Sequence, residues 1–106
     1  MSIKKAIIEK NEGEEVEKAE YINLILDDMT IGEISEEDRE FLEGFAETQF
    51  LSLNSTNLKS LQNLPGLPKL ERLELNDNKI GSDGIPSLGT LATLYKQLKL
   101  LKISNN

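Results

Sequence analysis

Leucine and isoleucine recur along the chain in the spacing L-x-x-L-x-L-x-x-N-x-L. One segment fills this spacing completely, the last nine residues fill as much of it as they can, and two earlier segments fit with substitutions. In chain order the four sets are Tyr21, Leu24, Leu26, Met29, Ile31; Thr48, Leu51, Leu53, Thr56, Leu58; Leu70, Leu73, Leu75, Asn78, Ile80; and Leu98, Leu101, Ile103, Asn106. Their third apolar positions are 27, 22 and 28 residues apart, which is the period of a leucine-rich repeat.

The Leu-x-Leu centre of each repeat alternates with a period of two, which is typical of a short β-strand whose leucines share one face. A single strand of this kind cannot bury its apolar face, whereas stacked repeats form a parallel sheet over a continuous core. We therefore predict an α/β fold: a right-handed leucine-rich repeat solenoid with a parallel β-sheet and a helical N-terminal cap. The whole chain, residues 1–106, is assigned to one domain, with a cap over residues 1–20, repeats near 21–47, 48–69 and 70–97, and an incomplete repeat over 98–106.

Each repeat ends at a position that is expected to turn inward. Asn78 and Asn106 occupy it in two repeats, and an asparagine side chain can satisfy backbone groups where a strand bends away. Thr56 can supply part of this bonding and Met29 cannot, so we expect the first repeat to be the least regular. We also expect Leu73, in the complete repeat, to be fully buried between neighbouring strands.

The segments that return between strands differ in their helical potential. Pro65 and Pro68 interrupt a row of leucines spaced every three residues, so short turns or extended chain are expected there. That row comprises Leu58, Leu61, Leu64, Leu67 and Leu70. After a turn at residues 81–84, a helix is favoured in the next segment, with an apolar face made of Ile85, Leu88, Leu91, Leu94 and Leu98.

Two helices are predicted in the first half of the chain. Ser2 can cap the first, which ends near residues 11–13. The second is expected to run from Ser35 to about Glu47, because Ser35 and Asp38 have the spacing of a capping box. Its inner face comprises Phe41, Leu42 and Phe45. These segments should cover the open edge of the first strand.

Composition excludes several classes of protein. The 106 residues include no cysteine, histidine or tryptophan, which rules out disulfide frameworks and thiolate metal sites and removes the commonest general base and zinc ligand. The neighbouring acids Asp27 and Asp28 would point to opposite faces of a strand rather than form an acid–base pair. Residues 76–84 resemble a calcium loop in composition but not in spacing. We expect no enzyme activity, no cofactor and no metal.

No apolar run in the sequence has the length that spans a bilayer, and the N-terminus lacks the apolar middle of a secretion signal. The protein is therefore expected to be intracellular, with no membrane partner. Charge is unevenly divided: residues 1–50 carry a net charge of −10 and residues 51–106 a net charge of +3. An acidic first half repels nucleic acid and attracts basic partners, although it can also be simply a solvated helix face. Ser35 precedes three acids, so it is either a plain helix cap or a site for an acid-directed kinase.

The alternate positions of the predicted strands would line the concave face of the solenoid, which repeat proteins use to bind partners. This face is the candidate binding surface. It comprises Asn23, Ile25, Asp27, Phe50, Ser52, Asn54, Arg72, Glu74, Asn76, Leu100, Lys102 and Ser104.

Three stretches, Phe50-Leu51-Ser52-Leu53, residues 61–67 and residues 70–80, together resemble the acidic leucine-rich nuclear phosphoproteins of 32 kDa. Residues 22–28 resemble the first strand of that family. The resemblance implies a nuclear adaptor that binds histones, masks histone tails and inhibits a serine/threonine phosphatase. The family continues through a further repeat, a cap, an acidic tail and an import signal, which this sequence lacks, so tail-dependent histone masking is not expected. A spliceosomal leucine-rich subunit is the nearest competing resemblance.

These observations predict a non-enzymatic protein-binding module that engages basic partners, histones first. An inhibitor of a serine/threonine protein phosphatase and a ribonucleoprotein scaffold subunit are the alternatives. The location is expected to be nuclear or cytoplasmic, with the nucleus favoured by the resemblance alone. Nothing in the sequence caps the last predicted strand, so we expect either a longer natural chain or self-association through that edge.

Overall fold

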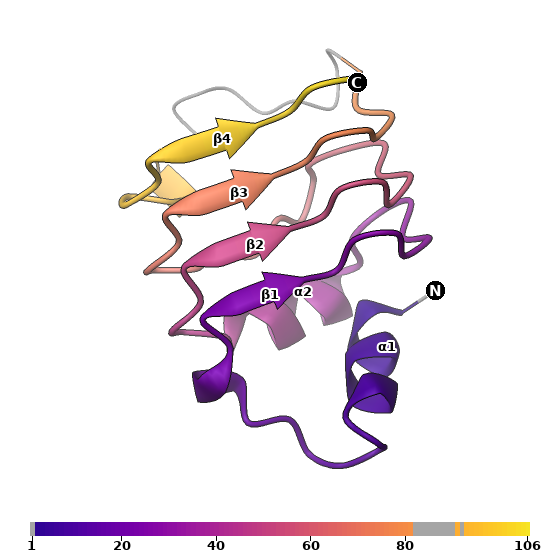
Figure 1. Cartoon of the computed structure of the whole chain (residues 1–106), viewed down its shortest axis with the longest axis vertical. Coiled ribbons are helices and arrows are strands. Elements are labelled where there is room, and N and C mark those ends of the chain that lie inside the picture. Colours follow the sequence, from indigo (N-terminus) through magenta and orange to yellow (C-terminus); the bar gives the residue numbers. More distant parts are fainter. Residues whose placement is uncertain (1, 82–90, 92) are drawn as a thin grey trace.

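The computed structural model describes residues 2–81, 91 and 93–106. Four short parallel strands form one sheet in chain order, β1-β2-β3-β4 (Figure 1). They are β1 (Asn23–Ile25), β2 (Phe50–Ser52), β3 (Arg72–Glu74) and β4 (Leu100–Lys102). In the register of the sheet, the central leucines Leu24, Leu51, Leu73 and Leu101 are direct neighbours. The α/β class and the parallel arrangement of the four predicted strands are therefore confirmed.

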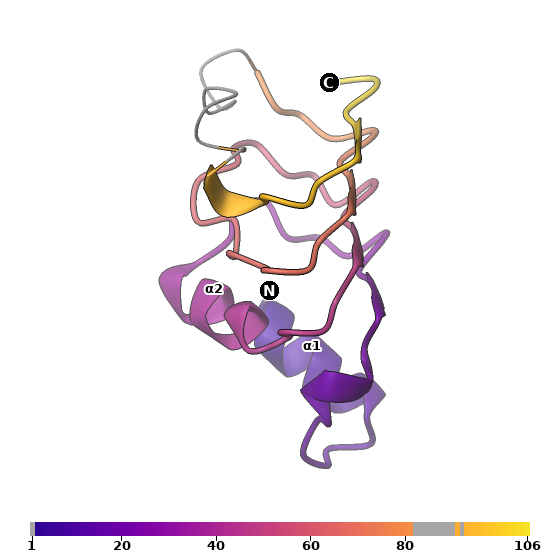
Figure 2. The same ribbon diagram turned by 90° about the vertical axis from the view of Figure 1, so that its left-hand side faces the viewer.

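Two α-helices, α1 (Ile3–Lys10) and α2 (Glu36–Glu43), lie at the β1 end of the sheet (Figures 1 and 2). As predicted, Ser2 caps α1 by accepting a hydrogen bond from the Lys5 amide, and Asn11 ends the helix. Ser35 caps α2 in the same way, by accepting from the Asp38 amide at 3.1 Å. A short 3₁₀ turn, Lys18–Glu20, leads into β1. This arrangement is compatible with the predicted helical cap.

The predicted end of α2 at about Glu47 is wrong, because the helix stops at Glu43. Beyond Gly44 the chain turns so that Phe45 is completely buried. The Thr48 hydroxyl then donates to the Tyr21 carbonyl at 2.5 Å, which ties the segment to the start of β1. These tertiary contacts outweigh the local tendency to continue the helix.

A buried carboxylate joins the two helices. Asp38 is 2% exposed, and its side chain accepts hydrogen bonds from the Ile3 amide at 2.9 Å, the Lys4 amide at 3.1 Å and the Ser2 hydroxyl at 3.2 Å. The first amides of a helix lack partners within the helix and carry its positive end. Asp38 therefore satisfies the N-terminus of α1 from within the first turn of α2, instead of completing a capping box in its own helix.

The opposite end of α2 is held by a lysine. The Lys18 ammonium donates to the Phe41 carbonyl at 2.8 Å and lies 4.1 Å from the centre of the Phe41 ring. A cation at this position complements the negative end of the helix. Burial, and secondarily the nearby Lys4, lowers the pKa of Lys18.

The core lies between the sheet and the returning segments, and leucine dominates it. Leu73 is completely buried, as predicted. The five leucines around Pro65 and Pro68 are all at most 4% exposed, and the described chain there forms turns and extended segments. In the next segment, Leu91 and Tyr95 are buried, and residues 91, 93 and 94 are helical. Ile85 and Leu88 of the predicted helix lie outside the described residues.

Every strand is followed by the same backbone turn. Four residues with φ between 57° and 65° occupy equivalent places after the strands: Asp28, Ser55, Asp77 and Asn105. Three of the four are Asp or Asn, the non-glycine residues that tolerate this left-handed conformation best. No helix among residues 2–81, 91 and 93–106 is long and apolar enough to cross a membrane.

Candidate binding surface

One face of the sheet is turned away from the helices and the returning segments (Figure 2). We call it the strand face, and it carries three rows of side chains that cross the strands. The register defines two rows, Asn23, Phe50, Arg72, Leu100 and Ile25, Ser52, Glu74, Lys102. The third row, just beyond the strands, is Asp27, Asn54, Asn76 and Ser104. The structure thus brings all of the predicted binding residues onto one continuous surface.

The third row forms a ladder of side-chain-to-backbone hydrogen bonds. Asp27 Oδ1 accepts from the Asn54 amide at 2.9 Å, Asn54 Oδ1 from the Asn76 amide at 2.7 Å, and Asn76 Oδ1 from the Ser104 amide at 2.8 Å. Each side chain therefore fixes the backbone of the following strand. The Asp or Asn at each of these three places is visible in the sequence, where the period of two predicts an outward side chain but not its bond to the next strand.

A polar network connects the ladder to the other rows. The Ser52 hydroxyl donates to Asp27 Oδ1 at 2.5 Å. Asn54 Nδ2 lies 3.0 Å from both Ser52 Oγ and Glu74 Oε1. Glu74 also accepts from Arg72 Nε at 2.6 Å and forms an ion pair with the same guanidinium. The Arg72 guanidinium lies 4.8 Å from the centre of the Phe50 ring, a separation typical of a cation–π contact.

The network buries two of the side chains that point to this face. Ser52 is 1% exposed and bonds to Asp27 and Asn54. Glu74 is 8% exposed and bonds to Asn54 and Arg72. The hydrogen bond from Asn54, opposed by burial and helped by Arg72 and Lys102, holds the pKa of Glu74 below its usual value. Glu74 is thus a carboxylate whose charge is already balanced within the protein.

The groups that remain accessible on the strand face are different ones. Ile25 is 53% exposed and Leu100 is 40% exposed, and Asn23 and Lys102 are also exposed. Asp27 is half-buried, and the hydrogen bonds formed among the described residues use only its Oδ1 atom. The face therefore offers apolar side chains at both ends and one carboxylate oxygen next to Ile25.

The predicted inward position is confirmed for Asn78, whereas Asn106 makes equivalent bonds but is exposed. Asn78 is 6% exposed, and its Oδ1 accepts from the amides of Thr56 and Leu58, while its Nδ2 donates to the carbonyls of Leu53 and Leu75. The Thr56 hydroxyl lies 3.0 Å from the Leu53 carbonyl, so it supplies part of the bonding, as expected. Asn106 is the equivalent at the next strand, where it accepts from the Ile80 amide at 3.1 Å.

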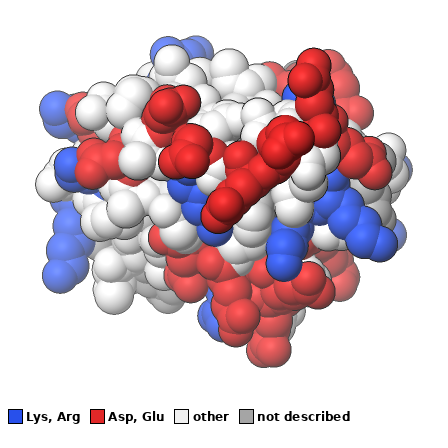
Figure 3. Space-filling view, turned by 90° about the horizontal axis from the view of Figure 1, so that it is seen from below, with Lys and Arg blue, Asp and Glu red and all other residues white. Residues whose placement is uncertain are grey.

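Acidic side chains dominate the surface at the β1 end of the molecule (Figure 3). Exposed glutamates come from the segment before β1 and from α2; they are Glu12, Glu14, Glu15, Glu17, Glu20, Glu36, Glu37, Glu40 and Glu43. The acidic excess of the first half is therefore carried by the segment before β1 and by α2 more than by the strand face.

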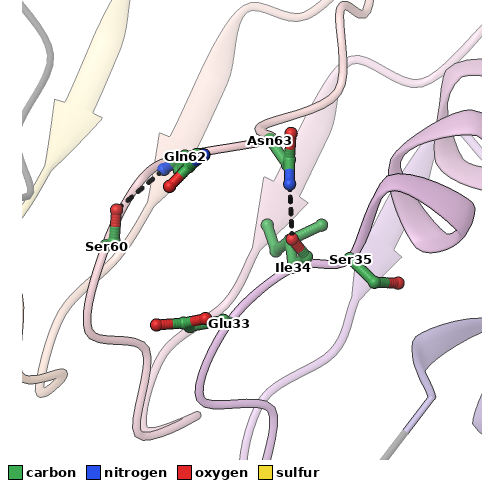
Figure 4. Close-up of a pocket in the computed structure, with 6 residues that line it drawn as sticks. All are labelled: Glu33, Ile34, Ser35, Ser60, Gln62 and Asn63. Atoms are coloured by element: carbon green, nitrogen blue, oxygen red, sulfur yellow. Dashed lines mark hydrogen bonds between the residues drawn. The ribbon is translucent and has the colours of Figure 1, made fainter.

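A polar cavity of about 340 Å³ lies between two loops near the start of α2 (Figure 4). Its lining comprises Glu33, Ile34, Ser35, Ser60, Gln62 and Asn63. Asn63 Nδ2 donates to the Ile34 carbonyl at 3.0 Å, and Ser60 Oγ accepts from the Gln62 amide at 3.0 Å (Figure 4). The bond from Asn63 joins the two loops, and the bond to Ser60 lies within one of them. Ser35 is exposed and acts as a helix cap, while its phosphorylation stays a prediction.

Among the residues that the structure describes, no group of three Asp or Glu side chains could hold a metal ion. No protein-family model matches the chain, and neither a curated protein nor a solved structure matches it.

Proposed function

We propose that the chain is a leucine-rich repeat solenoid of the kind found in the acidic leucine-rich nuclear phosphoproteins, and that it is a non-enzymatic module that binds basic protein segments, histones first. The observation that carries the proposal is the strand face: four strands present a continuous surface whose side chains are fixed across the strands by the polar network. A surface held rigid in this way loses little conformational entropy when a partner binds.

Asp27 is the residue that we assign to contact with a basic side chain. Its Oδ1 is occupied by Ser52 and Asn54, which orients Oδ2 for a lysine or arginine of the partner. Ile25 lies two residues earlier on the same face and is 53% exposed, so it can pack against the aliphatic part of that side chain. The acidic cap would raise the rate of encounter by attracting the basic partner over a longer distance.

The proposal is tested by Asp27→Asn, measured as binding of purified core histones and of a lysine-rich peptide at several salt concentrations. The asparagine keeps an oxygen that can accept from Ser52 and Asn54, so the fold is preserved while the charge is removed. We expect affinity to fall about threefold to tenfold, which corresponds to about 0.7–1.4 kcal/mol, and the salt dependence to become shallower.

Asp28→Asn is the matched control, because Asp28 is the exposed neighbour and its φ of 65° suits asparagine. A second control, Glu14→Lys with Glu17→Lys, alters the charge of the cap without touching the face. Equal losses in Asp27→Asn and Asp28→Asn would mean that overall charge attracts the partner and that the face has no special role. Recovery of a phosphatase subunit or of ribonucleoprotein components from nuclear extract, without histones, would reject histones as the partner.

A further inference from the structure

The outer edge of β1 is unpaired, although the chain that precedes it is folded. β1 is the first strand of the sheet (Figure 1). The Ile22 carbonyl and the Leu26 amide bond to β2, so the amides and carbonyls of the alternate residues, Asn23 and Ile25, point to the opposite side. Neither of these two amides has an acceptor among the described residues, and residues 2–20 form no backbone hydrogen bond with β1.

Two exposed isoleucines accompany this edge, at places where the other repeats carry polar residues. Ile25 is 53% exposed and Ile22 is 42% exposed. The residues at the same two places in the other repeats are Ser52, Glu74 and Lys102, and Gln49, Glu71 and Lys99. Proteins usually protect an open sheet edge with charged residues or proline. Exposed apolar side chains beside such an edge are therefore a feature of a binding surface.

An open cavity of about 440 Å³ lies at the start of the same edge. Its lining comprises Glu20, Tyr21, Ile22 and Asn23. The Tyr21 ring packs edge-on against the ring of the buried Phe45, with 5.4 Å between the ring centres, so one wall of the cavity is held in place by the core. The cavity has room for an apolar side chain of a partner, which would cover Ile22 and remove it from water.

Charge defines the kind of segment that fits. Residues 12–28 carry one base and seven acids, which are Glu12, Glu14, Glu15, Glu17, Glu20, Asp27 and Asp28. The base, Lys18, donates to the Phe41 carbonyl of α2. Acidic side chains also dominate the view of the molecule from the β1 end (Figure 3). A basic segment therefore complements this edge better than a neutral or acidic one.

We infer that the outer edge of β1 binds an extended segment in which basic and apolar residues alternate, and that this segment adds to the sheet as a strand. Its basic side chains lie on the strand face, where Ile25 and Asp27 receive them, and its apolar side chains lie on the other side, at Ile22 and the cavity. The inference rests on the proposed function for the class of partner and adds the edge and the backbone bonds that hold it. A second copy of the chain fits less well, because two β1 edges would bring the Asp27 carboxylates together.

The test uses the whole chain and a peptide, blocked at both ends, in which lysine and valine alternate. A control peptide has the same composition and charge, with its lysines and valines in separate blocks. Amide hydrogen exchange follows the binding, and we expect the alternating peptide to protect the amides of Asn23 and Ile25. It should bind about tenfold more tightly than the control peptide, because only an alternating strand places valine beside Ile22 while its lysines lie on the strand face.

Two variants of β1 locate the interaction. Ile25→Pro removes a docking amide that points away from β2, so it should abolish binding without breaking a hydrogen bond of the sheet. Should that variant unfold, Ile25→Ser keeps every backbone group and should weaken binding about fivefold by removing the apolar contact. The matched control is Val16→Ser, which removes a half-buried apolar side chain from a different cavity, next to Ile8 and Phe41, and should bind as the parent does.

Three results would overturn the inference: equal binding of the two peptides, binding that leaves the exchange of the Asn23 and Ile25 amides unchanged, or equal losses in Ile25→Ser and Val16→Ser. Protection of these amides that grows with protein concentration in the absence of peptide would also overturn it, in favour of a second copy. Histone binding that depends on Asp27 but does not protect these amides would overturn the inference and leave the proposed function in place. No binding of histones or of either peptide would overturn both.

Discussion

Asn78 is the side chain whose removal should be most informative about how the strands are held together. In Asn78→Ala, the carbonyls of Leu53 and Leu75 keep other donors, the Thr56 hydroxyl and Asn106 Nδ2 respectively. The amides of Thr56 and Leu58 lose the Asn78 Oδ1 atom, which lies 2.9 and 3.1 Å away. Two backbone amides are therefore left without this acceptor in the interior.

The loss of unfolding free energy in Asn78→Ala can be estimated from these two buried amides. A buried donor without an acceptor costs about 1–3 kcal/mol, so the variant should lose about 2–6 kcal/mol. A domain of this size has a total free energy of unfolding of about 5–15 kcal/mol. In urea, with a slope of about 2 kcal/mol per molar, the midpoint should fall by about 1–3 M.

Urea unfolding followed by circular dichroism measures this shift, and Asn106→Ala is the matched control. Asn106 makes an equivalent set of bonds, but it is exposed at the end of the sheet, where water can replace the lost partner. We expect that control to lose no more than about 1 kcal/mol. Equal shifts in the two variants, or a midpoint change below about 0.5 M in Asn78→Ala, would refute the role assigned to the buried amides.

Four shorter predictions concern the core, the cap, the network and the pH dependence. Leu73→Asp places a carboxylate at a fully buried position and should abolish the cooperative thermal transition seen by circular dichroism. Asp38→Ala removes the acceptor of the first amides of α1 and should cost about 2–4 kcal/mol, with hydrogen exchange rising in α1 more than in the sheet. The pKa of Glu74 is lowered in the folded state, so its carboxylate stabilises the fold at pH values above the usual glutamate pKa. This contribution is lost as the pH falls through the folded pKa. The urea midpoint of Glu74→Gln should therefore depend less on acidic pH than that of the parent. Burial raises the pKa of Tyr95, whose hydroxyl donates to a carbonyl at 2.7 Å, so the parent should lose stability as the pH rises past about 10, and Tyr95→Phe should lose less over that range.

A specific result would contradict each of these four predictions. An unaltered melting curve in Leu73→Asp would contradict the assignment of the repeat core. Uniform changes in exchange across Asp38→Ala would show that the carboxylate does not act on α1 specifically. Parallel acid titrations of the parent and Glu74→Gln would contradict the lowered pKa, and parallel alkaline titrations of the parent and Tyr95→Phe would contradict the raised one.

The positions of the strands, and the side chains that point inward from them, could be predicted from the sequence. The Leu-x-Leu spacing placed all four strands, because alternating apolar residues can be buried only on one face of an extended chain. It also identified the inward position of Asn78, since a polar residue inside an apolar pattern must satisfy backbone groups to be tolerated. The ends of α1 followed from local signals, the Ser2 cap and the loss of apolar spacing near Asn11.

Features that depend on residues far apart in the chain could not be read in this way. The capping-box spacing of Ser35 and Asp38 predicts a local bond for the Asp38 side chain as well as for its amide, yet that side chain bonds to α1, more than thirty residues away in the sequence. The end of α2 was misplaced because burial of Phe45 and the bond from Thr48 to Tyr21 decide where the helix stops.

The exposure of each side chain on the strand face depends on contacts between strands that are far apart in the sequence. The period of two correctly placed Ser52 and Glu74 on the outer face. It does not predict which side chains of neighbouring strands lie beside them. In the folded sheet, Asp27 from the neighbouring repeat bonds to Ser52, and Asn54 from the neighbouring repeat bonds to Glu74. Alternation along a strand fixes the side to which a residue points, whereas its access to solvent depends on the size and bonding of side chains brought alongside by the packing of other strands.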